Sequence, residues 1–296
     1  MKCQTEKNRM IINENCKKCQ LKKNMKSYPA GASPDKIEAY QSRVREILDN
    51  CDGLSTPQVA EKMYDLRREL FGADKDYSEI KKYYNRRMLS LLPYMEHRVR
   101  AAKDPLMMAV QYAMAGNYID FGAMDSVDEN QLKVQLDQAA GIVINADVLD
   151  SFRKDILSAR QMVYFTDNCG EIVTDKLLIS VMRSLAPELV VTVIVRSKDA
   201  VNDATIDDAG QIRMKDVATR VIGNGNGMPG NVISEMSPEA MSAIEKADFL
   251  ISKGQGNYEG LSGCGLNIYY LFLCKCEAFM KRFDVPQFTG IMTHEK

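Results

Sequence analysis

The part of the sequence that most constrains the fold is residues 163–175, VYFTDNCGEIVTD. It opens with apolar residues that are typical of a buried strand. It then breaks at Asp167-Asn168-Cys169-Gly170, residue types that favour turns and helix starts. Apolar residues at helical spacing follow from Ile172 onward. The pattern predicts a strand, a tight turn and a helix, with an acid and an amide at the carboxyl end of the strand.

This turn has the chemistry of a ligand site. Ligands bind at the carboxyl edge of open parallel sheets. The N-terminus of a helix attracts anions, because its first N–H groups lack partners and its dipole is positive there. The oxygens of Asp167 and Asn168 are hard ligands, so the turn suits a divalent cation that bridges to a phosphate. The alternative is that Asp167 only caps the helix, as acidic residues commonly do.

The rest of the C-terminal part repeats the alternation of strand and helix. Further buried strands are predicted at residues 189–195, 220–222, 247–251 and 268–273. Strands that alternate with helices imply a parallel sheet with right-handed crossovers. We therefore predict a three-layer, Rossmann-like α/β domain.

The N-terminal part has the apolar spacing of helices. Two predicted starts, at Ser33-Pro34 and Ser55-Thr56-Pro57, place a capping residue before a proline. A longer helix is predicted over residues 77–99, with an interruption near Pro93. The next helix is expected to end at Gly116 in the left-handed region. These helices predict an all-helical domain ahead of the α/β domain.

The chain has 296 residues, of which 45% are hydrophobic, enough for a large core and two domains. We predict three parts: a segment that contains cysteines, a helical domain that contributes a lid, and the α/β domain. They cover residues 1–30, 31–155 and 156–296.

Composition excludes several classes of function. The 39 basic and 40 acidic residues leave no global electrostatic case for binding nucleic acid. Without a long apolar run or an apolar signal core, neither a membrane span nor secretion is expected. Eight cysteines in such a chain suggest reduced thiols in the cytoplasm. With only His97 and His294, histidine-rich zinc chemistry is not expected, and His294 is predicted to lie in a frayed tail.

The pair Cys16 and Cys19 has the spacing of half a zinc site. The other candidate ligands are Cys264, Cys274 and Cys276, so a closed site would require the two ends of the chain to meet. One hypothesis is a structural metal at Cys16 and Cys19. The other is ordinary thiols near a mobile terminus.

Polar groups follow three of the predicted strands. Asp167 and Asn168 follow the first, Asp203 the second, and Lys253 and Asn257 the fourth. In a parallel sheet these strand ends lie on one edge, so the side chains are expected to converge. Two carboxylates and an amide oxygen can hold one hard cation, and a lysine beside glycines can reach a phosphate. The convergence favours a binding site over helix capping.

These residues resemble the damage-control phosphatase family, formerly a domain of unknown function numbered 89. The resemblance rests on the motifs DNCGE, NDAT, SKGQGNY and AGNYID, which begin at residues 167, 202, 252 and 115. The pair Cys16 and Cys19 is similar to the prokaryotic subgroup. Cys169 departs from the pattern, which has alanine there, and a thiol at that position would soften the site or make it oxidisable.

The resemblance implies a metal-dependent phosphatase that acts on small phosphometabolites, including sugar phosphates. Asp167, Asn168 and Asp203 would hold manganese, magnesium, cobalt or nickel. Asp167 or Asp203 would also orient the water that attacks phosphorus. The catalytic set would be Asp167, Asp203 and Lys253, with Lys253 gripping the phosphate.

The resemblance also implies a set of substrate-binding residues: Asn117, Asp120, Glu171, Lys253 and Asn257. Asn117 and Asp120 would close over the substrate from the helical side. On local grounds alone, their segment is an ordinary turn built from turn-forming residues.

Competing interpretations use the same edge of the sheet. Gly225–Gly230 fits the G-x-G-x-x-G pattern, but it follows the third strand and contains a proline, so a substrate loop or a turn fits better. A methyltransferase with a nucleoside cofactor would also place an acidic turn after its first strand, without a need for Asp203 or Lys253. A non-catalytic metabolite-binding protein is the third alternative.

Overall fold

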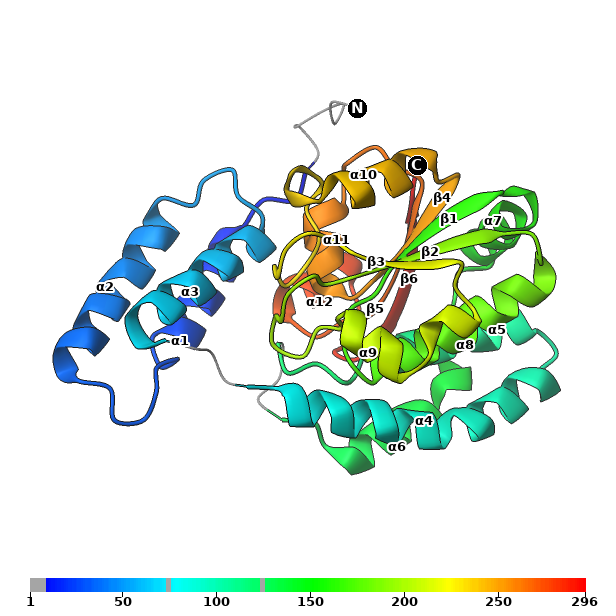
Figure 1. Ribbon diagram of the computed structural model, residues 1–296, viewed down its shortest axis with the longest axis horizontal. Coiled ribbons are helices and arrows are strands. Elements are labelled where there is room, and N and C mark those ends of the chain that lie inside the picture. The colour runs from blue at the N-terminus through cyan, green and yellow to red at the C-terminus, as the bar shows by residue number, and fades with distance from the viewer. Residues whose placement is uncertain (1–8, 73–75, 123–125) are drawn as a thin grey trace.

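The structure, a computed structural model, describes residues 9–72, 76–122 and 126–296. Its centre is a six-stranded sheet with the order β3-β2-β1-β4-β5-β6 (Figure 1). Strands β1 to β5 are parallel, and β6 runs antiparallel to β5. Helices cover both faces, which confirms the predicted α/β class, and the sheet is parallel as predicted except for β6. The strands are β1 (Gln161–Phe165), β2 (Val190–Val195), β3 (Arg220–Gly223), β4 (Phe249–Lys253), β5 (Ile268–Leu273) and β6 (Gly290–Glu295).

The central strands are apolar on both faces because both faces are covered. In β1, Met162 and Tyr164 face one core, and Val163 and Phe165 face the other. This alternation buries two layers of side chains with a single run of apolar residues. It also explains why these strands were predictable from the sequence.

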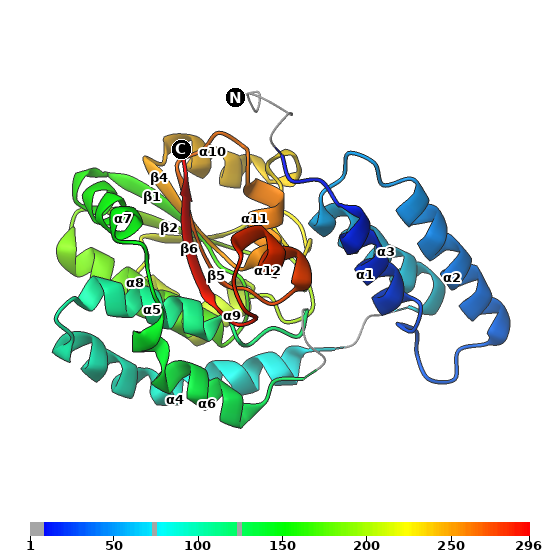
Figure 2. The same cartoon turned by 180° about the vertical axis from the view of Figure 1, so that it is seen from behind.

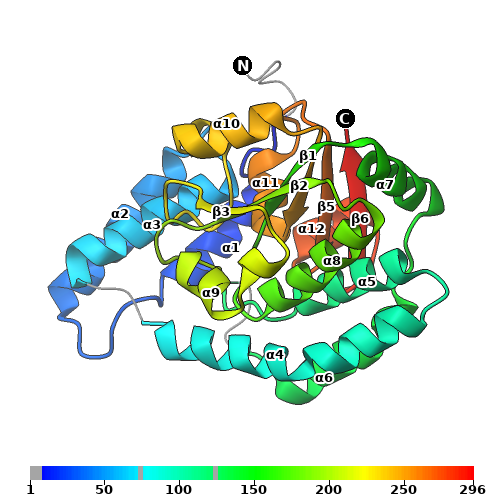
Figure 3. The ribbon, with the colours of Figure 1, turned by 45° about the vertical axis from the view of Figure 1, so that its right-hand side comes forward.

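One face of the sheet is covered by a layer of helices that includes α4, α5 and α8, which pack on one another (Figure 3). The helices that contribute side chains to the core on this face are α4 (Ser78–Ala101), α5 (Pro105–Gly116), α6 (Glu129–Asp137), α7 (Ala146–Ser158), α8 (Glu171–Leu185) and α9 (Ile206–Gln211). The opposite face is covered by α10 (Pro238–Lys246), α11 (Gln255–Leu261) and α12 (Glu277–Phe283).

The first three helices form a small unit beside the sheet (Figures 1 and 2). They are α1 (Glu14–Asn24), α2 (Pro34–Asp49) and α3 (Thr56–Phe71), and they share a core of their own. Helix α3 of this unit packs on α11, and Lys23 at the end of α1 donates to the carbonyl of Gly122. The division of the chain at residues 30 and 155 stays a prediction.

Two details of the helical part differ from the predictions. Helix α4 runs through Pro93 without interruption, because it packs along α5 and α8. Helix α5 ends at Gly116, as predicted, but Gly116 is not in the left-handed region, and the C-cap Asn117 has a right-handed conformation. Gly116 is needed for close packing instead, since a Cβ there would lie 2.4 Å from the hydroxyl of Thr174 on α8.

The prediction of a frayed tail around His294 was wrong. His294 belongs to β6 and stands opposite Tyr269 of β5. The two rings are stacked, with their centroids 4.0 Å apart, and His294 Nε2 lies 2.6 Å from Asn267 Oδ1. Pairing with β5 thus orders a segment that has no strong strand pattern of its own.

Candidate active site

The turn after β1 places an acid at the carboxyl edge of the sheet, as predicted. Helix α8 begins at Glu171, and its N-cap is Gly170, which has a φ of 70°. Asp167 lies three residues before this cap, so the alternative that Asp167 caps the helix was wrong. Gly170 suits the turn because glycine adopts positive φ without strain. The carboxylate of Asp167 is therefore not used as a helix cap and is available to bind a ligand beside the positive end of α8.

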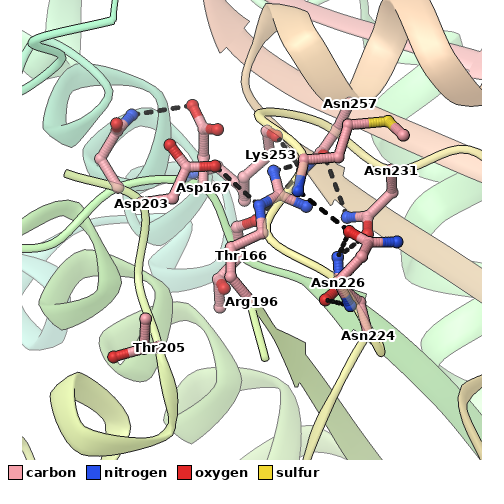
Figure 4. A network of polar contacts seen from close by, with 12 residues as sticks. Thr166, Asp167, Arg196, Asp203, Thr205, Asn224, Asn226, Asn231, Lys253 and Asn257 are labelled. Atoms are coloured by element: carbon pink, nitrogen blue, oxygen red, sulfur yellow. Dashed lines mark hydrogen bonds and ion pairs between the residues drawn. The ribbon is translucent and has the colours of Figure 1, made fainter. Parts of the chain in front are cut away.

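The segment after β2 brings Asp203 to the same place. Asn168 and Asp203 form an isolated antiparallel bridge, and the N–H of Ala204 donates to the carbonyl of Asp167 over 2.7 Å. Figure 4 shows the side chains of Asp167 and Asp203 next to each other. The structure therefore brings the side chains of the two acids together, as the sequence predicted.

Amide groups hold one oxygen of Asp167 in place. Oδ2 accepts hydrogen bonds from Asn117 Nδ2 at 3.0 Å and from Asn168 Nδ2 at 2.8 Å. Both amides also donate to Oε2 of Glu171, at 2.8 and 2.9 Å. Asn117 is fully buried, and its own oxygen accepts from the backbone of Leu273. Asn117 therefore lies behind the carboxylates and supports them, which differs from the expected position over the substrate.

The backbone of Gly254 closes tightly against the same acid. Gly254 has a φ of 80°, and a Cβ there would lie 2.0 Å from Oδ2 of Asp167. Only glycine fits such an approach. The end of β4 thus contributes its backbone to the site, next to the turn after β1.

Lys253 is directed into the protein beneath the site. Its Nζ contacts Glu171 Oε1, Asp175 Oδ1 and the carbonyl of Ala113, each at 2.7 Å. The side chain is fully buried, so all three N–H groups of the ammonium have protein acceptors. Burial lowers the pKa of Lys253, but Asp175 and Glu171 outweigh it and raise the pKa above its usual value. The predicted phosphate contact of Lys253 would require one of these bonds to break.

The remaining predicted residues line the rim or the base of the site. Asp120 forms an ion pair with Lys275 at 2.6 Å. Asn257 is fully buried, donates to the carbonyls of Thr166 and Lys253, and accepts from Arg196.

Two cations of the site were missed from the sequence, Arg196 and Lys275. Arg196 directly follows the second predicted strand, so the same rule of strand ends would have found it. Lys275 lies two residues beyond β5, which places it on the same edge of the sheet.

The electrostatics of the site favour a cation. Burial, followed by repulsion from Glu171 and Asp203, raises the pKa of Asp167 well above its ordinary value. Burial also raises the pKa of Asp203 to about 6, although Arg196 opposes this shift. Carboxylates that are crowded in this way are stabilised in their charged form by a bound positive ion.

The donor atoms also fit a divalent cation. Within the described part of the chain, no hydrogen bond reaches Oδ1 of Asp167, Oδ1 of Asp203 or Oδ1 of Asn168. An oxygen without a hydrogen bond is either fully buried or exposed to solvent. These three oxygens are not among the fully buried ones, so solvent reaches each of them. No three His, Cys, Asp or Glu side chains of the described residues are grouped to hold a metal. A cation here would therefore need the amide oxygen of Asn168 beside the two carboxylates, a ligand set that suits manganese or magnesium.

Cys169 does not take part in this donor set. Its side chain is fully buried, and its sulfur accepts from Asn202 Nδ2 at 3.8 Å. Burial raises the pKa of the thiol far above its usual range, which makes it a poor nucleophile and a poor metal ligand.

The N-terminal cysteines lie elsewhere. Cys16 and Cys19 are both on α1, and burial followed by the charges of Glu259 and Cys276 raises the pKa of Cys16 to about 11. A structural metal at Cys16 and Cys19 stays a prediction. Among the described residues, no helix combines the length and apolar character needed to cross a membrane.

The fold and the site together define an α/β protein with a cluster of buried acids at the carboxyl edge of its parallel strands. Residues 12–290 match the family model described as the damage-control phosphatase ARMT1-like domain. The chain therefore belongs to this family.

Relatives with known names support the assignment. The chain is 34% identical over 221 residues to a damage-control phosphatase of Archaeoglobus fulgidus, covering 73% of this chain and 75% of the relative. It is 30% identical over 189 residues to the damage-control phosphatase PH1575 of Pyrococcus horikoshii, covering 64% of each. The crystal structure of a DUF89 family protein from Pyrococcus horikoshii has the same fold, with a TM-score of 0.75 and 24% identity. That comparison covers 97% of this chain and all of the other. These relatives support a phosphatase activity.

Proposed function

We propose that the protein is a metal-dependent phosphatase that hydrolyses small phosphorylated metabolites such as sugar phosphates. The observation that carries the proposal is the set of three accessible oxygens on Asp167, Asn168 and Asp203, placed beside the N-terminus of α8. The names of the relatives support the same class of reaction. The candidate metals are manganese, magnesium, cobalt and nickel.

The chemistry of the proposed reaction divides between the ion and the protein. When bound, a divalent metal supplies Lewis acidity toward the phosphoryl group and lowers the pKa of the attacking water. Asp167, Asn168 and Asp203 would hold the ion, while hydrogen bonds from Asn117, Asn168 and Arg196 occupy the second oxygens of the two carboxylates. The positive end of the α8 dipole would favour the negative charge of a phosphoryl group held there.

The atoms of the reaction balance without a further reactant. Water attacks phosphorus, the bond from phosphorus to the ester oxygen breaks, and the alcohol leaves with one proton of the water. Asp167 or Asp203 orients the water. Inorganic phosphate keeps the other proton.

The test begins with metal-stripped protein and a panel of para-nitrophenyl phosphate and sugar phosphates. We expect phosphate release only after one of the four metals is restored. Asp167→Asn keeps the shape of the side chain and removes its charge, and should reduce turnover by at least about 100-fold. Asp248→Asn is the matched control, because Asp248 accepts from the backbone of Arg160 and Gln161 at the opposite edge of the sheet.

Several outcomes would overturn the proposal. Absence of metal-dependent phosphate release from every substrate argues for a non-catalytic binding protein. Tight binding of S-adenosylmethionine in calorimetry argues for the methyltransferase. Full activity of Asp167→Asn removes Asp167 from the metal site.

A further inference from the structure

Arg196 is a buried cation at the centre of the site that the sequence motifs do not explain. It directly follows β2, and only 2% of its side chain is exposed. Its Nε donates to Oδ2 of Asp203 over 2.7 Å, and its Nη2 donates to Oδ1 of Asn257 over 3.0 Å. These two bonds use two of the five N–H groups of the guanidinium.

The other nitrogen, Nη1, is open to a ligand. No hydrogen bond from Nη1 is found within the residues that the structure describes, and Nη1 is not a fully buried atom without a partner. Solvent therefore reaches it. In the planar guanidinium, Nη1 lies on the side of Cδ and Nη2 on the side of the Nε–H, so the open nitrogen points away from the carboxylate of Asp203 that Nε holds.

A chain of asparagines fixes the orientation of this guanidinium (Figure 4). Asn231 donates to Oδ1 of Asn257 at 2.9 Å, beside the bond from Arg196. Asn224 donates in turn to Oδ1 of Asn231 at 3.0 Å, and all three amides are buried. Asn224 and Asn231 flank the segment Gly225–Gly230, so the G-x-G-x-x-G pattern serves here to support Arg196.

Lys253 and Arg196 differ in whether they have N–H groups left for an anion. All N–H groups of Lys253 have protein acceptors at 2.7 Å, and its side chain is fully buried. Arg196 has N–H groups to spare on a nitrogen that solvent reaches. An arginine in a fixed orientation suits phosphate, because its fork of donors matches the oxygens of the group.

We infer that Arg196 is a substrate-binding residue: Nη1 donates to a phosphoryl oxygen while Nε holds Asp203. This inference rests on the proposed phosphatase function and assigns the phosphate contact to Arg196, not Lys253. Asn257, Asn231 and Asn224 act as positioning residues for the guanidinium.

The test measures binding and not only turnover. Arg196→Lys keeps a positive charge beside Asp203 but removes the fork of donors. Calorimetry with manganese alone, and then with inorganic phosphate on the manganese-loaded protein, separates the two ligands. We expect phosphate affinity to fall about 10- to 100-fold in Arg196→Lys, with manganese affinity within about threefold of the wild type. Arg220→Lys is the matched control and should change neither, since Arg220 is an exposed residue at the start of β3.

A second variant covers the case in which Arg196→Lys fails to fold. Asn231→Ala removes one support of the guanidinium, and should weaken phosphate binding by about threefold to tenfold without loss of manganese affinity. Unchanged phosphate affinity in both variants, or in whichever of them folds, overturns the inference and leaves the phosphatase proposal intact. A wild-type protein that binds none of manganese, magnesium, cobalt and nickel, and no phosphate in the presence of any of them, overturns both.

Discussion

Replacement of Lys253 by methionine tests whether this residue supports the site from within. Lys253→Met keeps most of the volume of the side chain but removes the ammonium from Glu171 and Asp175, which are both buried. Removal of one partner of a buried ion pair costs about 3–5 kcal/mol, because an uncompensated charge remains in the interior. We expect a loss of this size in the free energy of unfolding at about pH 8.

The same variant has a pH dependence with a defined sign. In the wild type, burial raises the pKa of Asp175 from 3.8 to about 7, although Lys253 opposes the shift. Between these two values the folded protein binds more protons than the unfolded chain, so this group reduces stability as the pH rises. Without Lys253 the pKa of Asp175 rises further. Lys253→Met should therefore lose more stability at about pH 8 than at about pH 5, where the folded protein takes up a proton.

Urea denaturation followed by circular dichroism at the two pH values measures both effects. The matched control is Lys82→Met, whose side chain is exposed and forms an ion pair with Glu79 on the same helix. It should change stability by less than about 0.5 kcal/mol at either pH. A loss below about 1 kcal/mol for Lys253→Met at pH 8 would show that the two carboxylates do not depend on this lysine, and would favour a direct role at the phosphate.

Three further predictions address other parts of the molecule. Gly254→Ala should abolish manganese binding in calorimetry, because its Cβ would collide with the carboxylate of Asp167; binding within threefold of the wild type would refute the close approach. Cys169 should react with iodoacetamide only after denaturation, as measured by mass spectrometry, while the exposed Cys19 reacts in the native protein; equal rates would contradict the burial of Cys169. His294→Ala should lower the free energy of unfolding by about 1 kcal/mol in urea titrations, through loss of the stack on Tyr269, and no change would mean that the end of β6 frays in solution.

Much of the α/β architecture was predictable because its strands are buried on both faces. Such strands appear in the sequence as short apolar runs, and parallel strands place their carboxyl ends on one edge. The positions of Asp167, Asn168 and Asp203 follow from these two rules alone. Strand β6 was missed because it lies at the edge of the sheet and is half-polar, so its pairing with β5 comes from the fold and not from a local pattern.

The functions of the charged side chains could not be predicted in the same way. Lys253 is the last residue of β4, and Arg196 directly follows β2. The side chain of Lys253 nevertheless pairs with Glu171 and Asp175, whereas that of Arg196 pairs with Asp203. Which acceptors surround a cation depends on α5 and α8, which reach it only after the chain has packed.

Local patterns of apolar and turn-forming residues were therefore enough to establish the sheet, its functional edge and the acids on that edge, because these patterns act over a few neighbouring residues. The partners of each charge were decided only when distant segments came together. The energy of a buried charge depends on every group within a few ångströms. Local sequence patterns do not show which groups these are, because they come from segments that are far apart in the sequence.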